Sequence, residues 1–506
     1  MTARRVRESG PPRTAAAPEL VDSGFALENA DAPFLHRGLN LADMGHVLDL
    51  ARRGLVPDDA RQAVLALLLE ADATPPEDFP YDPELGEPYN SREAYFVSRI
   101  GDAAGWLHAG RPRREAVRIA LRLHIRRQII ELIRDTARFG LAAVDRAEEH
   151  AETVMPDQTY LQHAQPSTFG HYILSFVYSA VRDAERLLGE LDWVDASPGG
   201  AGCVNGTRLL TDREFIASTL GFSDVIEHTR DAMWQVDGLI AVLATSSSLL
   251  TTFCKLAEDL EIWSSSEFDY VDLDDGYTRA SVLMPQKRNP YALSIIRGAS
   301  GVLIGRLAGF LAVTKSPSAR SDNLIYAYGE VPRALDLAVR IARLSAGVVR
   351  TLRVNKDRLA EEVRGGYTQA TDLAEYLVQS CDVDYRTAYL IVGRTVRAAS
   401  RAGVRGVAIT GEMIDEAAVE HRGTPLGVAG RDLSAVLDPW QIVLSRDARG
   451  GASPDALARM TTSLRTRLDR LATSAADRLA GYDSAEAALL AAARQGASPT
   501  PSGGAR

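Results

Sequence analysis

Hydrophobic residues recur at intervals of three and four along most of the chain, as they do on helices that bury one face. Several of these periodic stretches are longer than the usual globular helix, which favours a bundle of long helices. Breaks rich in Pro, Gly or Asp separate them. We therefore predict an all-α fold, with helices at 40–53, 58–70, 91–107, 115–149, 166–191, 229–263 and 289–314.

The same pattern divides the chain into three helical parts. A small N-terminal domain is expected at 19–110, a central domain with the long helices at 111–360, and a C-terminal domain at 361–485. Composition predicts disorder at 1–18 and at 486–506, where the chain ends in a Pro-, Ser- and Gly-rich tail.

Composition narrows the class of protein. The 506 residues are 46% hydrophobic and 25% charged, which suits a globular protein with a sizeable core. The net charge of −10 argues against a nucleic-acid partner. The uncharged stretch 238–254 approaches the lower limit of a membrane span, but six Ser and Thr residues within 245–252 favour a buried core helix, so we expect no membrane partner.

Cysteine and histidine usage gives no sign of a metal or a disulfide. Cys203, Cys254 and Cys381 lie far apart without a CxxC spacing, so free thiols in a reducing compartment are expected. The nine histidines form no ligand pattern, and we expect no metal and no cofactor. The basic N-terminus lacks an apolar segment typical of a secretory signal, which favours a cytoplasmic location.

The segment from Ala280 to Pro290 carries the most informative chemistry. It reads Ala-Ser-Val-Leu-Met-Pro-Gln-Lys-Arg-Asn-Pro, and its prolines exclude it from a regular helix. Ser281, Lys287 and Asn289 supply a hydroxyl, an ammonium and an amide, which together can remove a proton beside a carboxylate and hold the resulting charge. Only four of the 57 basic residues are lysines, so the compact charge of Lys287 indicates a chemical role. The alternative is a surface turn with a solvated basic pair.

This segment and the acidic stretch before it closely resemble the signature region of the aspartase/fumarase superfamily. Within that superfamily it is most similar to argininosuccinate lyases, whose loop typically reads Gly-Ser-Ser-Leu-Met-Pro-Gln-Lys-Lys-Asn-Pro. Further stretches that resemble this family follow in the expected order at 107–115, 158–171, 367–377, 437–439 and 450–451. The resemblance implies a signature loop at 278–290 and a homotetramer with a central core of twenty helices, five from each chain. It also implies active sites that each collect residues from three subunits.

The resemblance further implies a reaction, the elimination of an amine or related group from a substituted succinate to release fumarate. The substrate is then a small dicarboxylate, and cationic and amide donors stabilise its carbanion. By motif position, Ser281 is the catalytic base, Lys287 and Asn289 bind a carboxylate beside it, and Thr159 and Arg113 contact the substrate. Ser281 satisfying its own turn, Thr159 capping a helix and Arg113 forming a helix-start ion pair are the structural alternatives.

Several residues depart from the family pattern. Tyr160 stands where the family has the histidine linked to proton transfer, and Tyr89 replaces another histidine. A tyrosine is a weaker proton shuttle near neutral pH, so Tyr160 acts as an acid, a hydrogen-bond donor or a spacer. Arg114 replaces an amide and Arg320 begins a divergent stretch at 320–325, and both could hold extra negative charge.

These substitutions favour a specialised lyase of secondary metabolism that acts on an anionic succinate derivative rather than on argininosuccinate. A true argininosuccinate lyase of arginine biosynthesis remains an alternative reading, as does an inactive scaffold with a lyase fold. A cycloisomerase of the same superfamily is a further alternative, because a fold does not fix its chemistry.

Overall fold

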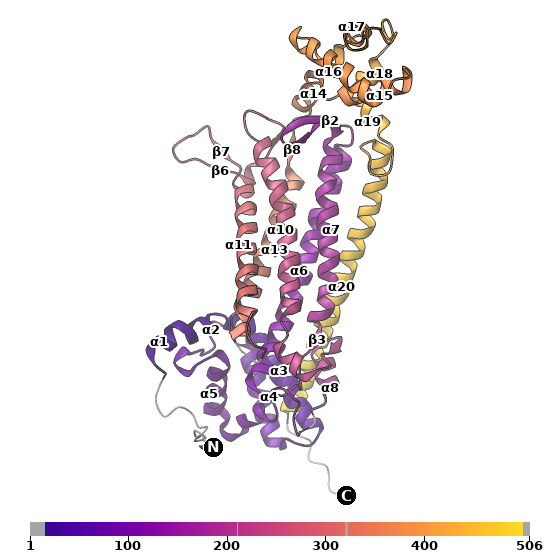
Figure 1. Cartoon of the computed structure of the whole chain (residues 1–506). Coiled ribbons are helices and arrows are strands. Elements are labelled where there is room, and N and C mark those ends of the chain that lie inside the picture. Colours follow the sequence, from indigo (N-terminus) through magenta and orange to yellow (C-terminus); the bar gives the residue numbers. More distant parts are fainter. Residues whose placement is uncertain (1–15, 210, 319–321, 499–506) are drawn as a thin grey trace, which may run out of the picture.

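Five long helices packed side by side form the body of the protein (Figure 1). The computed structural model describes residues 16–209, 211–318 and 322–498. A sixth long helix, α20, runs along the outside of the bundle (Figure 1). The prediction of an all-α fold is confirmed. The six helices are α6 Arg113–Glu149, α7 Phe169–Val194, α10 Asp237–Trp263, α11 Tyr291–Thr314, α13 Ala327–Thr351 and α20 Pro454–Ala497.

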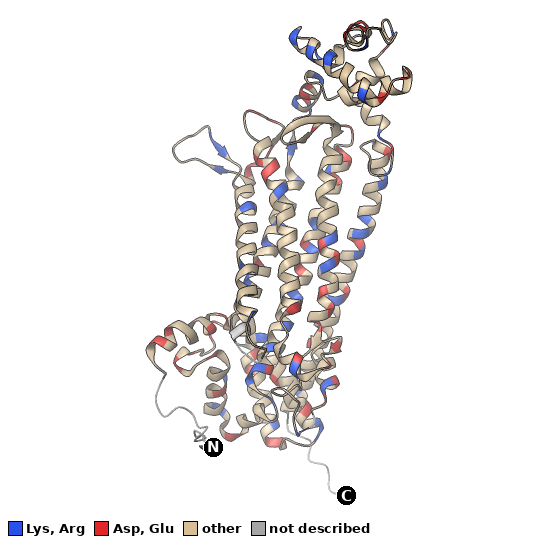
Figure 2. Cartoon of the chain, in the orientation of Figure 1, with Lys and Arg blue, Asp and Glu red and all other residues tan. Residues whose placement is uncertain are grey.

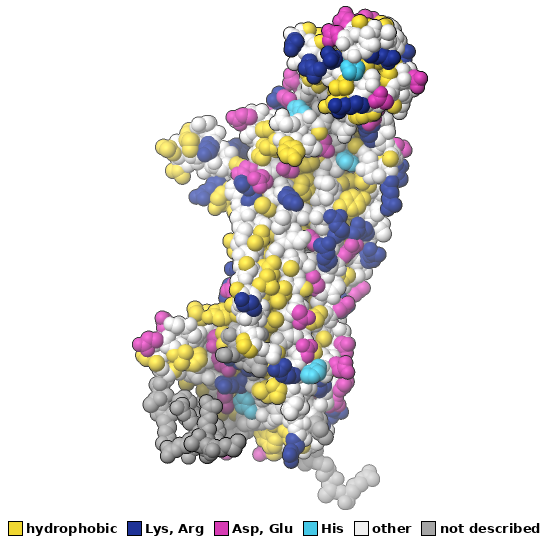
Figure 3. Space-filling model, viewed as in Figure 1, with side chains coloured by type: hydrophobic (Ala, Val, Ile, Leu, Met, Phe, Trp, Pro, Cys, Tyr) yellow, Lys and Arg dark blue, Asp and Glu magenta, His cyan; other side chains and the backbone are white. Residues whose placement is uncertain are grey.

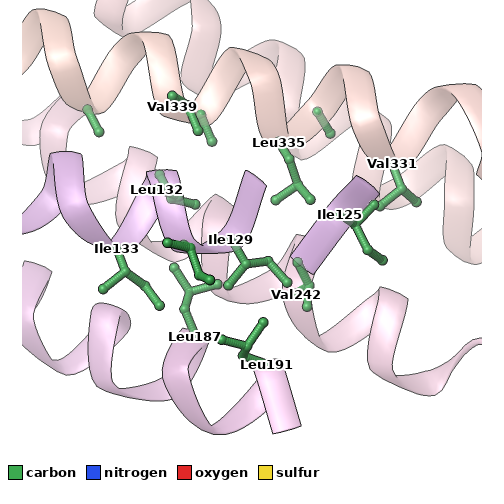
Figure 4. Close-up of a cluster of buried hydrophobic side chains, with 14 of the residues drawn as sticks. Ile125, Ile129, Leu132, Ile133, Leu187, Leu191, Val242, Val331, Leu335 and Val339 are labelled. Carbon is green, nitrogen blue, oxygen red and sulfur yellow. The ribbon is translucent and has the colours of Figure 1, made fainter. Parts of the chain in front are cut away.

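The core of the bundle forms around α6. Branched side chains at every fourth position of α6, at Ile125, Ile129 and Ile133, are fully buried. They face Leu187 of α7 and Leu335 of α13, which are also fully buried (Figure 4). Each such side chain contributes roughly 1.5–3 kcal/mol when removed from water. The three-and-four periodicity of the sequence is thus the buried face of these helices.

The N-terminal helices pack at one end of the bundle and the C-terminal helices at the other (Figure 1). The C-terminal group has a separate hydrophobic core. The N-terminal group comprises α1 Pro18–Leu20, η1 Val21–Phe25, α2 Ala26–Ala30, α3 Ala32–Arg52, α4 Asp58–Ala73, η2 Pro83–Leu85, α5 Pro88–Ile100 and η3 Gly101–His108. The C-terminal group comprises α14 Lys356–Gly365, α15 Ala370–Ser380, α16 Tyr385–Arg401, η5 Gly406–Ala408, α17 Gly411–Arg422, α18 Ser434–Leu437 and α19 Pro439–Ser445.

Short elements connect the long helices. Four two-stranded pairs occur in the described residues. They are β1 Val154–Thr159 with β2 Gln162–Thr168, β3 Ala196–Ser197 with β4 Asp224–Val225, β5 Val271–Asp272 with β8 Arg353–Val354, and β6 Arg279–Ala280 with β7 Arg288–Asn289. The remaining elements are α8 Arg213–Thr219, α9 Thr229–Trp234, η4 Asp275–Tyr277 and α12 Asp322–Ile325.

Several predicted boundaries differ from the structure, and the helix predicted at 40–53 begins earlier, at Ala32. The predicted helix 166–191 begins later, at Phe169, because residues 162–168 pair in a hairpin and the Thr168 side chain caps the helix by accepting from the His171 amide. The predicted helix 229–263 is two helices, α9 and α10, separated at Gln235 and Val236. The predicted 91–107 helix continues past Ile100 only as the 3₁₀ helix η3.

The prediction of disorder from residue 486 is wrong as far as Ala497. Helix α20 continues to that residue because Leu489 and Ala493 are buried against the N-terminal helices. Residues 454–485, expected in the C-terminal domain, belong to the same helix and pack along α6 and α7. The predicted disorder at 1–15 and at 499–506 falls outside the described residues.

Helices α10 and α11 are both long and apolar enough to span a membrane by length and composition. The apolar stretch of α10 is 61% buried, as expected for a core helix, whereas that of α11 is only 28% buried. Few charges lie on α11 (Figure 2), and hydrophobic side chains run along the bundle on this side (Figure 3). Ile295, Val302 and Ile304 are 42–50% exposed on α11. In the single chain, α11 therefore presents an uncovered apolar face.

Candidate active site

The predicted site residues lie in two groups at opposite ends of the bundle. Ser281, Lys287 and Asn289 on the β6–β7 hairpin, and Thr159 and Tyr160 on the β1–β2 hairpin, lie near the C-terminal helices (Figure 1). Arg113 and Arg114 begin α6 at the other end. A helix of 37 residues is roughly 55 Å long at about 1.5 Å per residue. The two groups of one chain are therefore too far apart to share one small substrate.

The signature loop is a hairpin whose serine is supported by backbone. Strands β6 and β7 pair Arg279 with Asn289, and the loop between them is mostly exposed. The Ser281 hydroxyl oxygen accepts a hydrogen bond from the Met284 amide at 3.0 Å. The Lys287 amide donates to the Met284 carbonyl at 3.1 Å, which closes the turn. An N–H directed at the serine oxygen satisfies the turn and also stabilises the oxygen once it is deprotonated.

The other polar side chains of the hairpin divide into free and anchored groups. The Lys287 ammonium is exposed, and no described acidic side chain pairs with it. The Asn289 amide donates to the Arg279 carbonyl at 2.9 Å, which leaves one of its two N–H groups for a ligand. Arg288 donates to Asp272 at 2.9 Å and to the Leu273 carbonyl at 2.9 Å, so it fixes the base of the hairpin. We did not predict this anchor, although the neighbouring Asp-rich stretch signals it.

The β1–β2 hairpin presents Tyr160 to solvent. Thr159 pairs with Gln162, so Tyr160 and Leu161 form a two-residue loop, and their φ angles are 56° and 58°. Positive φ at both positions is the mark of a type I′ turn, which favours Asn and Gly and strains larger residues. The Tyr160 side chain is 99% exposed, and Thr159 is exposed beside it. Such strain is often retained where a side chain must be displayed.

At the opposite end, Arg113 and Arg114 converge on one carboxylate. Arg113 Nη1 lies 3.5 Å from Glu87 Oε1, and Arg114 Nη2 lies 3.6 Å from Glu87 Oε2. The helix-start ion pair considered for Arg113 is thus present. Both distances are long for a bidentate pair, and both guanidinium groups remain partly exposed. A substrate carboxylate could therefore share these donors with Glu87.

Tyr89 has a structural role. Its hydroxyl is buried and donates to Asp43 Oδ1 at 2.9 Å, while Arg111 donates to the Tyr89 oxygen at 3.0 Å. Arg92 donates to the other oxygen of Asp43 at 2.8 Å. Burial and the adjacent Asp43 carboxylate raise the pKa of Tyr89 far above its usual value. The network of Asp43, Tyr89, Arg92 and Arg111 holds the segment that precedes α6.

Glu115 joins the start of α6 to a glycine-rich loop, and no motif in the sequence marks this role. Its carboxylate is buried and accepts hydrogen bonds from the amides of Gly200 at 2.7 Å and Gly202 at 2.8 Å. Burial raises the pKa of Glu115 to about 7, although Arg111 and both amides oppose the shift. Gly200 and Gly202 have φ of 71° and 63°, which suits glycine.

One further predicted residue, Arg320, lies outside the described residues. His163 contacts the Tyr270 hydroxyl at 3.3 Å and His171 contacts the Gly450 carbonyl at 3.0 Å, so both pack against neighbouring elements. Within the described ranges, no group of three or more His, Cys, Asp or Glu side chains could hold a metal ion, and the three cysteines are free.

A long-helix bundle that carries this serine hairpin at one end is the architecture of the aspartase/fumarase superfamily of lyases. The family model described as "Lyase" matches residues 85–305, and the model described as "Argininosuccinate lyase C-terminal" matches residues 367–444. An argininosuccinate lyase of Methanoculleus marisnigri is 35% identical over 433 residues, which cover 85% of this chain and 87% of the relative. The chain belongs to the argininosuccinate lyase family.

Other relatives agree with this membership. An argininosuccinate lyase of Methanothrix thermoacetophila is 33% identical over 454 residues, covering 89% of this chain and 91% of that protein. Among solved structures, EDDS lyase in complex with formate has a TM-score of 0.85 and 26% sequence identity, with 96% of each chain covered. The fold of this chain is therefore shared with a solved lyase of a different name.

Proposed function

We propose that this protein is a fumarate-releasing C–N lyase that eliminates an amine, or a related group, from a substituted succinate other than argininosuccinate. The observation that carries the proposal is the β6–β7 hairpin, where the Ser281 oxygen receives a backbone N–H and Lys287 stands free nearby. Two departures motivate the different substrate: Tyr160 in place of a histidine, and Arg114 in place of an amide.

In this proposal, the Ser281 oxygen removes the proton from the carbon beside a substrate carboxylate. The electron pair moves into that carboxylate, where Lys287 and the free Asn289 N–H stabilise the charge. The pair then forms the carbon–carbon double bond as the carbon–nitrogen bond breaks. The nitrogen, which is protonated as a secondary ammonium in the substrate, takes the bonding electrons and leaves as a neutral amine. The exposed Tyr160 hydroxyl donates a hydrogen bond to the departing nitrogen, and Thr159 beside it contacts the succinate.

The active site needs more than one copy of the chain. Arg113 and Arg114 lie at the far end of the bundle from Ser281, so a second copy with the opposite direction supplies them. The uncovered apolar face of α11 supports such an assembly, because an apolar helix face of this length is normally buried in a partner. A homotetramer in which the central helices of four chains pack together would cover it.

Substitution within α11 tests this assembly. Val302→Asp places a charge on the exposed face, where Val302 is 50% exposed. We expect smaller particles by size-exclusion chromatography with light scattering, together with loss of fumarate release. Val419→Asp is the matched control, because Val419 is 47% exposed on α17 of the C-terminal group. A Val302→Asp protein that keeps both its size and its activity would contradict the shared site.

The reaction is tested by fumarate release from N-substituted aspartates and from argininosuccinate, with wild-type protein and the Ser281→Ala variant. A general base typically contributes about 10²–10⁴-fold, so Ser281→Ala should lower kcat by that factor. Ser400→Ala, at an exposed position of α16, is the control. Equal activity of the Ser281→Ala and wild-type proteins, or no fumarate from any substrate, would reject the proposal.

A second candidate function is argininosuccinate lyase itself, and the specific observation in its favour is the 35% identity to a relative of that name. The same assay separates the two functions. The second candidate is correct if argininosuccinate is cleaved with a kcat/KM at least as high as that of every other substrate tested.

A further inference from the structure

A groove lies between α7 and α20, and none of the residues predicted for the reaction lines it. Its volume is about 950 Å³, which is within the range of small-molecule sites. The α7 side chains along it, Leu174, Ser175 and Tyr178, lie on one face of that helix. The other wall consists of α20 and the loop that precedes it. The groove is therefore a second candidate site, separate from the serine hairpin.

Every charged side chain in the described lining of this groove is basic. Arg449, Arg459 and Arg467 contribute three guanidinium groups, and the lining contains no Asp or Glu. Basic side chains also follow the part of α20 nearest the C-terminal helices (Figure 2). Because the chain as a whole carries a net charge of −10, a hollow with only cations on its walls is a local exception. It favours an anionic ligand.

The loop before α20 holds Arg449 in place but leaves its charge unpaired. His171 Nε2 contacts the Gly450 carbonyl at 3.0 Å, which ties the loop to α7. The Gly451 amide donates to the Ala448 carbonyl at 2.8 Å, which closes the turn around Arg449. Arg449 itself is exposed, and no described acidic side chain pairs with it. Its guanidinium is thus available to a ligand on a backbone that is already fixed.

The other two arginines are oriented by acids that lie outside the lining. Arg459 Nη2 donates to the carbonyl and to Oδ1 of Asp447, both at 2.8 Å. Arg467 donates to both carboxylate oxygens of Glu185, from Nε at 3.0 Å and from Nη2 at 2.7 Å. These bonds use one nitrogen of Arg459 and two of Arg467, so each guanidinium keeps N–H groups for a ligand. Side chains held in this way lose little entropy on binding.

The same groove has apolar and aromatic surface beside the cations. Leu174 is buried at its base, and Met460 and the ring of Tyr178 are half-buried around it. Burial raises the pKa of Tyr178, while the charges of Arg467 and Arg449 oppose the rise, so both arginines lie near the phenol. A tyrosine ring stacks on flat apolar groups, and a thioether packs against aromatic edges. The ligand should therefore carry a flat apolar body in addition to its charge.

We propose that this groove binds a phosphate monoester with an aromatic body, which is the chemistry of a nucleotide. The planar donor fork of arginine matches two phosphate oxygens at once, and three such forks suit a dianion. The aromatic body packs against Tyr178 and Met460. This binding site is additional to the lyase reaction and uses none of the groups assigned to it.

Calorimetric titration of the full-length protein tests the site, with adenosine 5′-monophosphate, adenosine and inorganic phosphate as probes. We expect the nucleotide to bind at least about 10-fold more tightly than either other probe, because it alone presents both the charge and the ring. Arg449→Ala should raise the Kd of the nucleotide by about 10- to 100-fold, as for loss of a hydrogen bond to a charged group. Arg186→Ala, at an exposed position of α7 outside the lining, should leave the Kd unchanged.

The outcomes that overturn the proposal are distinct. Absence of saturable binding by the nucleotide rejects the site, and equal affinity for the nucleotide and adenosine rejects the role of the arginines. Inorganic phosphate that binds as tightly as the nucleotide rejects the aromatic part. An unchanged Kd in Arg449→Ala places the bound nucleotide elsewhere and also rejects the site. Arg449 has no acidic partner to lose, so its removal does not threaten the fold. Binding is measured without turnover, so failure of the lyase proposal would not alter these results.

Discussion

Replacing Asp43 by Asn should destabilise the fold far more than removing an exposed ion pair. The Asp43 carboxylate is fully buried between Arg92 and Arg111, and all three side chains are at most 2% exposed. Burial opposes its ionisation, but the two guanidinium groups outweigh burial and hold the pKa of Asp43 below its usual value. The substitution keeps the shape and leaves two buried cations without a counter-charge, which costs about 3–5 kcal/mol.

The assay is urea unfolding followed by circular dichroism at pH 7 and a fixed protein concentration. Glu70→Gln is the matched control, because Glu70 pairs with Arg99 at 2.9 Å but the side chains are 51% and 45% exposed. An exposed pair of this kind contributes about 0–1 kcal/mol. If Asp43→Asn and Glu70→Gln lower the free energy of unfolding equally, the buried network is not what holds the start of α6.

Three further predictions concern the site. Burial raises the pKa of Glu115 from 4.5 to about 7, so the folded protein binds more protons than the unfolded chain between these values. Stability should therefore fall by roughly 3 kcal/mol as pH rises from 4.5 to 7, and Glu115→Gln should remove that slope in unfolding titrations. Arg288→Ala should release the hairpin and lower kcat about 10-fold or more in the fumarate assay, whereas Arg340→Ala, which removes only an exposed pair within α13, should not. Leu161→Gly should keep or raise Tm because glycine accepts positive φ; a Tm lower by several degrees would contradict the strained turn.

Sequence periodicity predicted the bundle because long amphipathic helices repeat one signal many times. The β1–β2 hairpin carried no such signal. Its turn residues, Tyr160 and Leu161, are not the glycines that usually mark a type I′ turn. The extension of α20 to Ala497 depends on burial of Leu489 against distant helices, which local composition does not report.

The sequence indicated candidate site residues but not the contacts that they make. Ser281, Lys287 and Asn289 lie on one hairpin, in the segment that the prolines were expected to keep out of a regular helix. Tyr89 was recognised as a substitution, but its partner Asp43 lies 46 residues earlier, and no local pattern links the two. The hydrogen-bond partners of Glu115 are likewise distant in sequence, because the two amides that donate to its carboxylate lie 85 and 87 residues later. Whether a polar residue stabilises the fold or is free to bind a ligand depends on partners that are distant in sequence. Those partners come together only when the chain folds.

The separation of the two groups of site residues gives the strongest constraint on how this protein works. Ser281 displays a supported oxygen on an exposed hairpin, and Arg113 and Arg114 display cations at the far end of the same bundle. Neither group alone encloses a substrate. Pairing of α11 faces between copies that run in opposite directions would place the hairpin of one chain near the arginines of another. The same contact that buries the apolar face would then complete the site, so assembly and catalysis should be lost together.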